Sequence, residues 1–251
     1  MLHLSKIISF TIVFMAFFLA CNKSEDVVRE TKNELELISS IKINVSEASG
    51  LAINTSGSTL YTVSDNTNNI YELSINGTVL KEYIYDGDDV EGISTVSADK
   101  VLFVEERNKE VVEYDLKSKN YIKHKVIYSN NSANSGLEGI AFNSNDNTTF
   151  ILNEKSPGVL MRLRSDFSII ESYDLNFASD YSGIFHDKDL NILWIVSDES
   201  KTVNKCSLKG ALIKSYAIDV IKAEGIAVTN NAIYIVSDSN STLFKFKKPI
   251  E

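Results

Sequence analysis

The chain has 251 residues, of which 43% are hydrophobic, and it carries a formal net charge of -9 at pH 7. With 2 prolines and 11 glycines, it has the apolar content for a large core and is neither collagen-like nor disordered. Nucleic-acid binding requires clustered lysine and arginine. Because this chain is acidic and has no such clusters, a nucleic-acid partner is not expected.

The first 20 residues differ from the rest of the chain. Lys6 is their only charge, and an apolar run extends over residues 7–19. This run is too short to cross a bilayer and is typical of the core of a secretory signal peptide. It ends at Ala20-Cys21, which resembles the lipobox of bacterial lipoproteins, although Phe18 stands where a leucine is usual. We predict cleavage before Cys21 and lipid attachment to it; an ordinary secretory signal is the alternative.

Residues 21–33 are polar without hydrophobic periodicity, and this pattern predicts a tether. Residues 1–20 are then a lipoprotein signal peptide, and residues 34–251 form the folded domain. The protein is expected in the cell envelope, anchored to a membrane by its lipid and facing the periplasm or the cell surface. With Cys21 lipidated, Cys206 has no partner for an intramolecular disulfide and is expected to be a packed core thiol.

From residue 47 onward the chain repeats one pattern five times. Each copy begins with an acidic residue that stands next to a glycine or three positions before it. A short apolar run and a polar turn follow. A second apolar run comes next and ends in a polar and an acidic residue. The repeat glycines are separated by 42, 47, 44 and 42 residues, and they are Gly50, Gly92, Gly139, Gly183 and Gly225. A nearly fixed period of this size indicates an array or a propeller.

Each copy of the repeat divides into four strand-like runs. The second run is apolar on both faces, as in Leu60–Val63, which is typical of a strand buried on both sides. The third run alternates apolar and polar residues, as in Ile70–Leu73, and the fourth run is more polar. Four antiparallel strands whose polarity rises outward form one blade of a propeller.

The fifth copy of the repeat lacks its fourth strand, because the chain ends at Glu251. The segment Leu35–Ile43, before the first copy, has the pattern of the missing strand. We therefore predict an all-β fold: a β-propeller of five four-stranded blades whose last blade is closed by the N-terminal strand. Closure of the ring removes sheet edges that would otherwise invite aggregation.

Four short stretches resemble the SdiA-regulated family, also called YjiK-like, in their order and spacing. They are Glu47–Ala52, Leu137–Ala141, Asn153-Glu154 and Ala223–Ala227. The resemblance covers roughly residues 35 to 248 and implies a propeller of the TolB-like and phytase-like group, often an envelope protein. The family has no settled activity, so the resemblance implies no particular reaction.

The repeat places acidic residues at one mouth of the central channel. The second strand of a blade runs antiparallel to the first, so its end lies beside the start of the inner strand. We therefore expect five pairs of neighbouring acids: Glu47 with Asp65, Glu91 with Glu106, Glu138 with Glu154, Asp180 with Asp198, and Glu224 with Asp238. Crowded carboxylates raise one another's pKa, and Arg107 and Lys155 are placed to neutralise part of the charge.

The remaining negative charge predicts a divalent cation, Ca²⁺, because carboxylate oxygens suit this ion. The predicted inner ligands directly precede a repeat glycine and are Glu91, Glu138 and Glu224, surrounded by Asp65, Glu106, Glu154, Asp198 and Asp238. Glu47 and Asp180 lie further from their glycines and are expected to face outward. Together with Asn66, Asn153, Arg107 and Lys155 they form the predicted ligand face. The alternative is that all these acids hydrogen-bond the turns between blades and bind nothing.

Three classes of function fit these residues. The first is a non-enzymatic, lipid-anchored envelope propeller, expected to be monomeric, that binds an unidentified ligand or protein partner at the acidic mouth. The second, implied by likeness to phytase-like and lactonase-like propellers, is Ca²⁺-dependent hydrolysis of a phosphoester or lactone. A purely structural spacer is a third class. The chain has no Gly-x-Ser-x-Gly motif, and of its 3 histidines only His186 is placed near the channel, so no catalytic residue is predicted.

Overall fold

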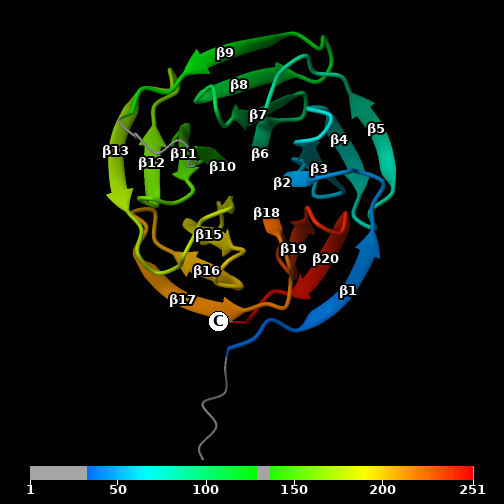
Figure 1. Cartoon of the computed structure of the whole chain (residues 1–251), viewed down its shortest axis with the longest axis vertical. Helices are drawn as coiled ribbons and strands as arrows, with labels where there is room; N and C mark the ends of the chain where they lie inside the picture. Colours follow the sequence, from blue (N-terminus) through cyan, green and yellow to red (C-terminus); the bar gives the residue numbers. More distant parts are fainter. Residues whose placement is uncertain (1–32, 129–135, 251) are drawn as a thin grey trace, which may run out of the picture. The chain divides into compact units, whose positions relative to one another are not determined.

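The computed structural model describes residues 33–128 and 136–250. The predicted signal peptide, the lipidation site Cys21 and nearly all of the tether lie outside the described residues. Lys32–Glu251 form one compact unit, whose described part contains 20 β-strands and no α-helix (Figure 1). It follows that no helix in this part of the chain is long and apolar enough to cross a membrane.

The strands form five sheets, each a blade of four antiparallel strands. The first blade consists of β2 (Ala48–Ile53), β3 (Thr59–Ser64), β4 (Ile70–Ser74) and β5 (Val79–Tyr83). The second consists of β6 (Val90–Ser97), β7 (Lys100–Glu105), β8 (Glu110–Asp115) and β9 (Tyr121–Lys125). The third consists of β10 (Leu137–Asn143), β11 (Thr148–Asn153), β12 (Val159–Leu163) and β13 (Ile169–Asp174). The fourth consists of β14 (Gly183–Asp187), β15 (Ile192–Ser197), β16 (Thr202–Cys206) and β17 (Leu212–Ala217).

The fifth blade joins the two ends of the chain. It consists of β18 (Ala223–Val228), β19 (Ala232–Ser237), β20 (Thr242–Lys247) and, as its outermost strand, β1 (Leu37–Lys42). In the antiparallel register of β1 and β20, Leu37 lies opposite Phe246 and Ile41 lies opposite Leu243. The prediction of five blades closed by the N-terminal strand is therefore confirmed, and Figure 1 shows the ring viewed along its axis.

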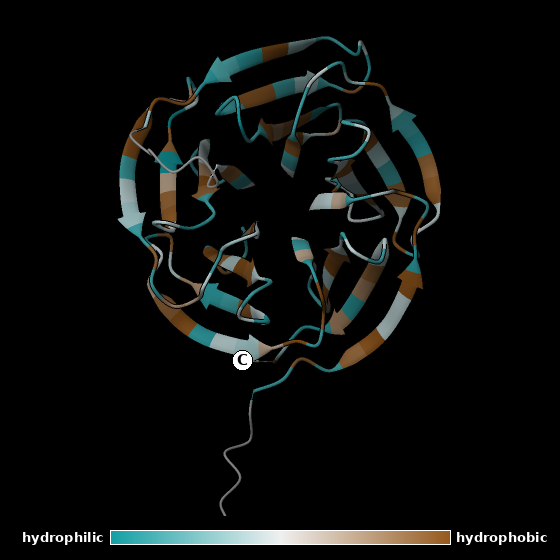
Figure 2. Cartoon of the chain, in the orientation of Figure 1, coloured by the Kyte–Doolittle hydropathy of each residue, from teal (hydrophilic) through white to brown (hydrophobic). Residues whose placement is uncertain are grey.

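Burial follows the order of strands within each blade. The second strands are buried along almost their whole length, as their continuous apolar runs predict. The outermost strands are mostly exposed, and Figure 2 shows hydrophilic and hydrophobic residues mixed along them. The core therefore consists of layers of apolar side chains between neighbouring blades, and Cys206 lies buried in one of them.

The repeat glycines allow the five inner strands to approach one another around the axis. A Cβ on Gly50 would lie 2.6 Å from the backbone nitrogen of Ile93 and 2.7 Å from the Cα of Gly92. The other repeat glycines similarly face the next blade, and Gly225 of the last blade meets the backbone of Gly50 in the first. Any larger residue would push these backbones apart, which explains why the repeat keeps a glycine here.

Candidate functional site

The ring of glycines separates two cavities on the propeller axis. The smaller, with a volume of about 220 Å³, is termed here the acidic mouth, and its lining residues are Glu47, Ser49, Asp65, Glu91, Glu138, Glu154, Ser182, Lys222, Glu224 and Asp238. The larger, termed the wide cavity, measures about 570 Å³. Residues directly before a repeat glycine line the acidic mouth, whereas residues directly after one, such as Leu51 and Ile93, line the wide cavity. The glycines therefore lie between the two.

The innermost wall of the acidic mouth comes from one position of the repeat, the residue before the glycine. This position holds glutamate in blades two, three and five and serine in blades one and four, and all five side chains line the cavity. In four of the five blades the pairing of the first two strands is irregular at this point. Such irregularities bend a strand and redirect its side chains, and here they coincide with residues that face the axis.

Glu138 has the most crowded surroundings of the three inner glutamates. Burial raises the pKa of its carboxyl group well above the ordinary value, and the charges of Glu91, Glu106 and Glu154 raise it further. This environment favours the protonated form of Glu138 over the ionised form, and a bound cation would offset the negative charge around it.

Burial also raises the pKa values of Glu91 and Glu224. Burial raises the pKa of Glu91 well above its ordinary value; a hydrogen bond with the Ser49 side chain opposes the shift, and the charge of Asp65 adds to it. Burial raises the pKa of Glu224 to about 7, although the nearby Lys222 ammonium lowers it. All three inner glutamates are therefore harder to ionise than an ordinary glutamate.

The outer wall of the acidic mouth contains three of the five acids that follow a second strand. They are Asp65, Glu154 and Asp238. Burial and the neighbouring charges of Asp89 and Glu47 raise the pKa of Asp65. Six of the eight predicted metal ligands thus line one cavity, as the antiparallel pairing of the first two strands predicts.

The other two predicted metal ligands do not line this cavity. Glu106 packs against Gly136 of the third blade, and burial together with the charges of Asp89 and Glu154 raises its pKa to about 7. Asp198 accepts hydrogen bonds from the backbone N–H groups of Lys222 at 2.6 Å and of Ala223 at 3.3 Å. Asp198 therefore holds the start of β18, which is a structural contact.

Glu47 and Asp180 lie elsewhere than expected, because neither faces outward. Glu47 is exposed, has a φ of 45°, and lines the acidic mouth. Asp180 is buried, with 3% of its surface exposed. It accepts a short hydrogen bond from the Ser197 hydroxyl and another, of 3.1 Å, from the backbone N–H of Glu199. These contacts hold the loop after β15, and they explain why an acid stands at this position of blade four.

The remaining residues of the predicted ligand face also lie outside the lining. Asn66 accepts a hydrogen bond of 3.3 Å from the Ser46 hydroxyl. Asn153 is buried and donates to the carbonyl oxygens of Lys155 at 3.2 Å and Pro157 at 2.7 Å, which orders the turn after β11. Arg107 pairs with Asp89 at 3.0 Å. Each of the three side chains therefore has a partner within the protein.

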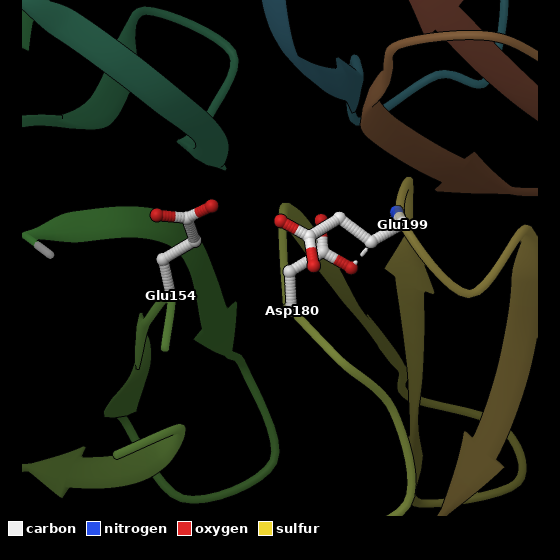
Figure 3. A group of neighbouring side chains, drawn as sticks. All are labelled: Glu154, Asp180 and Glu199. Carbon is white, nitrogen blue, oxygen red and sulfur yellow. Dashed lines mark hydrogen bonds between the residues drawn. The ribbon is translucent and has the colours of Figure 1, made fainter. Parts of the chain in front are cut away.

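Three carboxyl groups near the rim lie close enough to share a cation. Oxygens of Glu154, Asp180 and Glu199 are all within 4.8 Å of one another, and Figure 3 shows Asp180 and Glu199 of blade four facing Glu154 of blade three. The Lys155 ammonium lies 2.8 Å from Glu154 and 3.0 Å from Glu199. This lysine supplies positive charge to the cluster, as its position in the sequence predicts.

Sequence reasoning missed two residues of the site, Asp89 and Lys222. Both stand three positions before a repeat glycine, where the other blades have Glu47, Gly136 and Asp180. In four of the five blades the residue after the second strand bonds to this position: the backbone N–H of Glu106 donates to the Asp89 carbonyl at 2.9 Å, and that of Asp238 to the Lys222 carbonyl at 3.0 Å. Reading this position in all five copies would have located both residues.

The model of one protein family, SdiA-regulated, matches residues 26–247. The chain belongs to the SdiA-regulated family. This match spans all five blades, and it confirms the resemblance carried by the repeated Glu-Gly and Ser-Gly stretches.

Solved structures with the same fold include two groups of enzymes. Glutaminyl cyclase of Myxococcus xanthus matches with a TM-score of 0.66 and 11% identity, over 85% of this chain and 97% of that protein. A streptogramin B lyase matches with a TM-score of 0.51 and 17% identity, over 84% and 73% of the two chains. Virginiamycin B lyase of Staphylococcus aureus matches with a TM-score of 0.50 and 20% identity, over 86% and 75%. At these identities the likeness establishes the propeller fold alone.

Proposed function

We propose that this SdiA-regulated protein is a lipid-anchored propeller of the cell envelope. It binds Ca²⁺ at the acidic mouth and, with the ion in place, a ligand or protein partner. The observation that carries the proposal is the composition of the cavity: seven carboxyl groups and one ammonium group line a volume of about 220 Å³. So many like charges cannot all ionise in so small a space without a counter-ion.

The donor set of the acidic mouth fits Ca²⁺ better than a transition metal. The titratable side chains in its lining, apart from Lys222, are all carboxyl groups, without the imidazole or thiolate ligands that zinc and copper prefer. Ca²⁺ accepts about six to eight oxygen ligands in an irregular shell. Glu91, Glu138 and Glu224 come from three different blades, and a shell of variable geometry suits such a ring.

Cation binding at the acidic mouth is expected to release protons. The pKa values of Glu91, Glu138 and Glu224 are raised, so in the absence of the ion these groups hold their protons to a higher pH than ordinary glutamates do. A carboxyl group must lose its proton before it coordinates a metal, so affinity is expected to rise with pH. The proton and the cation therefore compete for the same oxygens.

Thermal melting with and without Ca²⁺ tests this proposal. We expect millimolar Ca²⁺ to raise the melting temperature over that in chelator, because a ligand at about 100 times its Kd stabilises a native protein by about 2.7 kcal/mol. Glu138→Gln removes a central ligand and is expected to lose most of this shift. The exposed Glu34→Gln is the matched control and is expected to keep it.

Two results would overturn the cation proposal. One is a wild-type protein whose melting temperature is the same in Ca²⁺ and in chelator. The other is a Glu138→Gln variant that shifts as much as the wild type, which would mean that the acids are structural.

A second candidate function, Ca²⁺-dependent hydrolysis of a phosphoester or lactone, is favoured by the pKa of Glu224. A carboxyl group with a pKa of about 7 suits a general base at neutral pH, and a metal ion beside it would polarise a substrate oxygen. A screen of the protein against phosphoesters and lactones, with and without Ca²⁺, measures this activity. Turnover that requires Ca²⁺ and is lost in Glu224→Gln would replace the binding function with the enzymatic one.

A further inference from the structure

The wide cavity lies on the opposite side of the glycine ring from the acidic mouth. Its volume of about 570 Å³ is within the range of about 300–1,000 Å³ that is typical of small-molecule sites. Inner strands of all five blades supply its apolar inner wall, which consists of Leu51, Ile93, Ala141, Ile184 and Val228. The ends of these strands and the loops that follow them supply a polar rim, so a ligand here would meet apolar groups toward the ring and polar groups toward solvent.

The charges in the wide cavity balance one another. Its charged side chains are Asp187, Lys188, Asp189 and Lys248. Asp187 and Lys248 form a buried ion pair of 2.7 Å, so this pair is already satisfied. Burial lowers the pKa of His186, which keeps its ring neutral at pH 7. The cavity thus selects neither an anion nor a cation, in contrast to the acidic mouth.

Uncharged hydrogen-bonding side chains dominate the rim of the wide cavity. Nine lining residues carry a hydroxyl or amide group, and they are Asn54, Thr55, Ser56, Ser94, Thr95, Ser144, Thr229, Asn230 and Asn231. Hydroxyl and amide groups both donate and accept hydrogen bonds, which matches ligand groups that do the same. Two half-buried aromatic side chains, Phe142 and Phe185, also belong to the lining and add flat apolar surface.

We propose that the wide cavity binds an uncharged sugar of one or two rings. Such a molecule carries many hydroxyl groups that donate and accept, no net charge, and C–H faces that pack on aromatic and aliphatic side chains. Each of these properties matches one property of the lining: the nine hydroxyl and amide side chains, the balanced charge, and the phenylalanines with the apolar inner wall. This site is independent of the cation at the acidic mouth.

Trp194 is a built-in reporter for ligands in the wide cavity. It is the only tryptophan of the chain, and its indole N–H donates to the Asp187 carboxylate at 3.4 Å. The Lys248 ammonium lies 6.0 Å from the centre of its ring. Because Asp187 and Lys248 line the cavity, a ligand that contacts them changes the electrostatic environment of the indole and therefore its fluorescence.

Titration of the full chain with neutral sugars tests the proposal. The probes are glucose, galactose, mannose, N-acetylglucosamine, maltose and cellobiose, with glucosamine and glucuronic acid as charged counterparts. The readouts are Trp194 fluorescence and saturation-transfer NMR of the sugar, both recorded in chelator so that the acidic mouth plays no part. We expect saturable binding of at least one neutral sugar, and binding weaker by about tenfold for its charged counterparts.

Matched variants assign the binding to the wide cavity. Ser144→Arg places a bulky side chain in the rim and is expected to abolish binding, whereas Ser172→Arg, on an outer strand of the same blade, is expected to leave it unchanged. Asn230→Ala is expected to weaken binding about tenfold by removing one hydrogen-bonding group, and Asn176→Ala, away from the cavity, is expected to have no effect.

If the two variants of a pair melt at the same temperature, misfolding is excluded as the cause of a difference in their sugar binding. The proposal is overturned if neither readout detects a neutral sugar, or if the charged counterparts bind as well. It is also overturned if Ser144→Arg binds as tightly as Ser172→Arg.

Discussion

The carboxyl groups of Glu91, Glu138 and Glu224 determine how the acidic mouth responds to pH. Burial and the charges of neighbouring acidic groups raise their pKa values, so ionising them costs more free energy in the folded protein than in the unfolded chain. In a native state without a bound cation, protonation is therefore stabilising. Glu105, whose pKa is lowered, has the opposite effect: its ionisation stabilises the folded protein. It titrates below the ordinary glutamate value of 4.5, and therefore below the pH range in which Glu224 loses its proton.

We predict that the cation-free protein loses stability as pH rises. The contribution of Glu224 is fully present below its ordinary pKa of 4.5 and is lost as pH rises through about 7. Melting in chelator at about pH 5 and about pH 8 should show a loss of roughly 2 kcal/mol at the higher pH. Glu224→Gln, which cannot ionise, should have a flatter profile, and Ca²⁺ should restore the wild type at high pH. A wild-type profile that rises over this range would contradict the assignment of raised pKa values.

The N-terminal strand β1 closes the ring by pairing with the last strand of the chain, β20. β1 pairs with β20 along its length, and the residues before it reach the fourth blade as well. The backbone N–H of Ala217 donates to the Asn33 carbonyl at 2.7 Å, and that of Leu35 donates to the Ala217 carbonyl at 3.1 Å. The segment thus holds blades four and five together, which the pattern of Leu35–Ile43 alone does not indicate.

Deletion of this segment is expected to destabilise the propeller. Removing residues 34–43 exposes the edge of β20 and takes away the buried side chains of Leu35 and Ile43, which contribute at least about 3 kcal/mol. Removing residues 22–32, which lie within the predicted tether of residues 21–33, is the control and is expected to leave the melting temperature unchanged. Equal melting temperatures for the two deletions would mean that the ring does not depend on this closure.

The two cavities on the propeller axis differ in their chemistry. The acidic mouth offers carboxyl groups, whereas the wide cavity offers hydroxyl and amide groups of balanced charge. Because each inner strand, together with the residue directly before it, contributes to the lining of both cavities, one on each side of its repeat glycine, both cavities depend on the same five strands. A substitution of a repeat glycine is therefore expected to affect both cavities together.

Attachment to a membrane is a property of the whole molecule that the N-terminal sequence predicts. Ala20-Cys21 after a short apolar run leads us to expect a mature N-terminus at Cys21 that carries a lipid. Mass spectrometry of the protein purified from its own membranes should show acylation of Cys21, and Cys21→Ser should leave the protein unlipidated. A mature N-terminus at another residue, without lipid, would refute this prediction.

The sequence by itself determined the architecture and the gathering of acids at one mouth. Five copies of one pattern, with glycines at a nearly constant spacing, predict five equivalent blades, and the polar and acidic ends of the second strands predict which end of the channel is negative. These features were predictable because they depend on local periodicity and on the antiparallel pairing of neighbouring strands.

Which acids share a cavity depends on the folded structure and could not be predicted from the repeat. Asp180 and Glu47 occupy the same position of the repeat, yet Asp180 is buried against Ser197 whereas Glu47 lines the mouth. The chemistry of the wide cavity likewise depends on residues from all five blades that are distant in sequence. Packing between blades sets the direction of each side chain, and that packing follows from the three-dimensional closure of the ring, which no single repeat encodes.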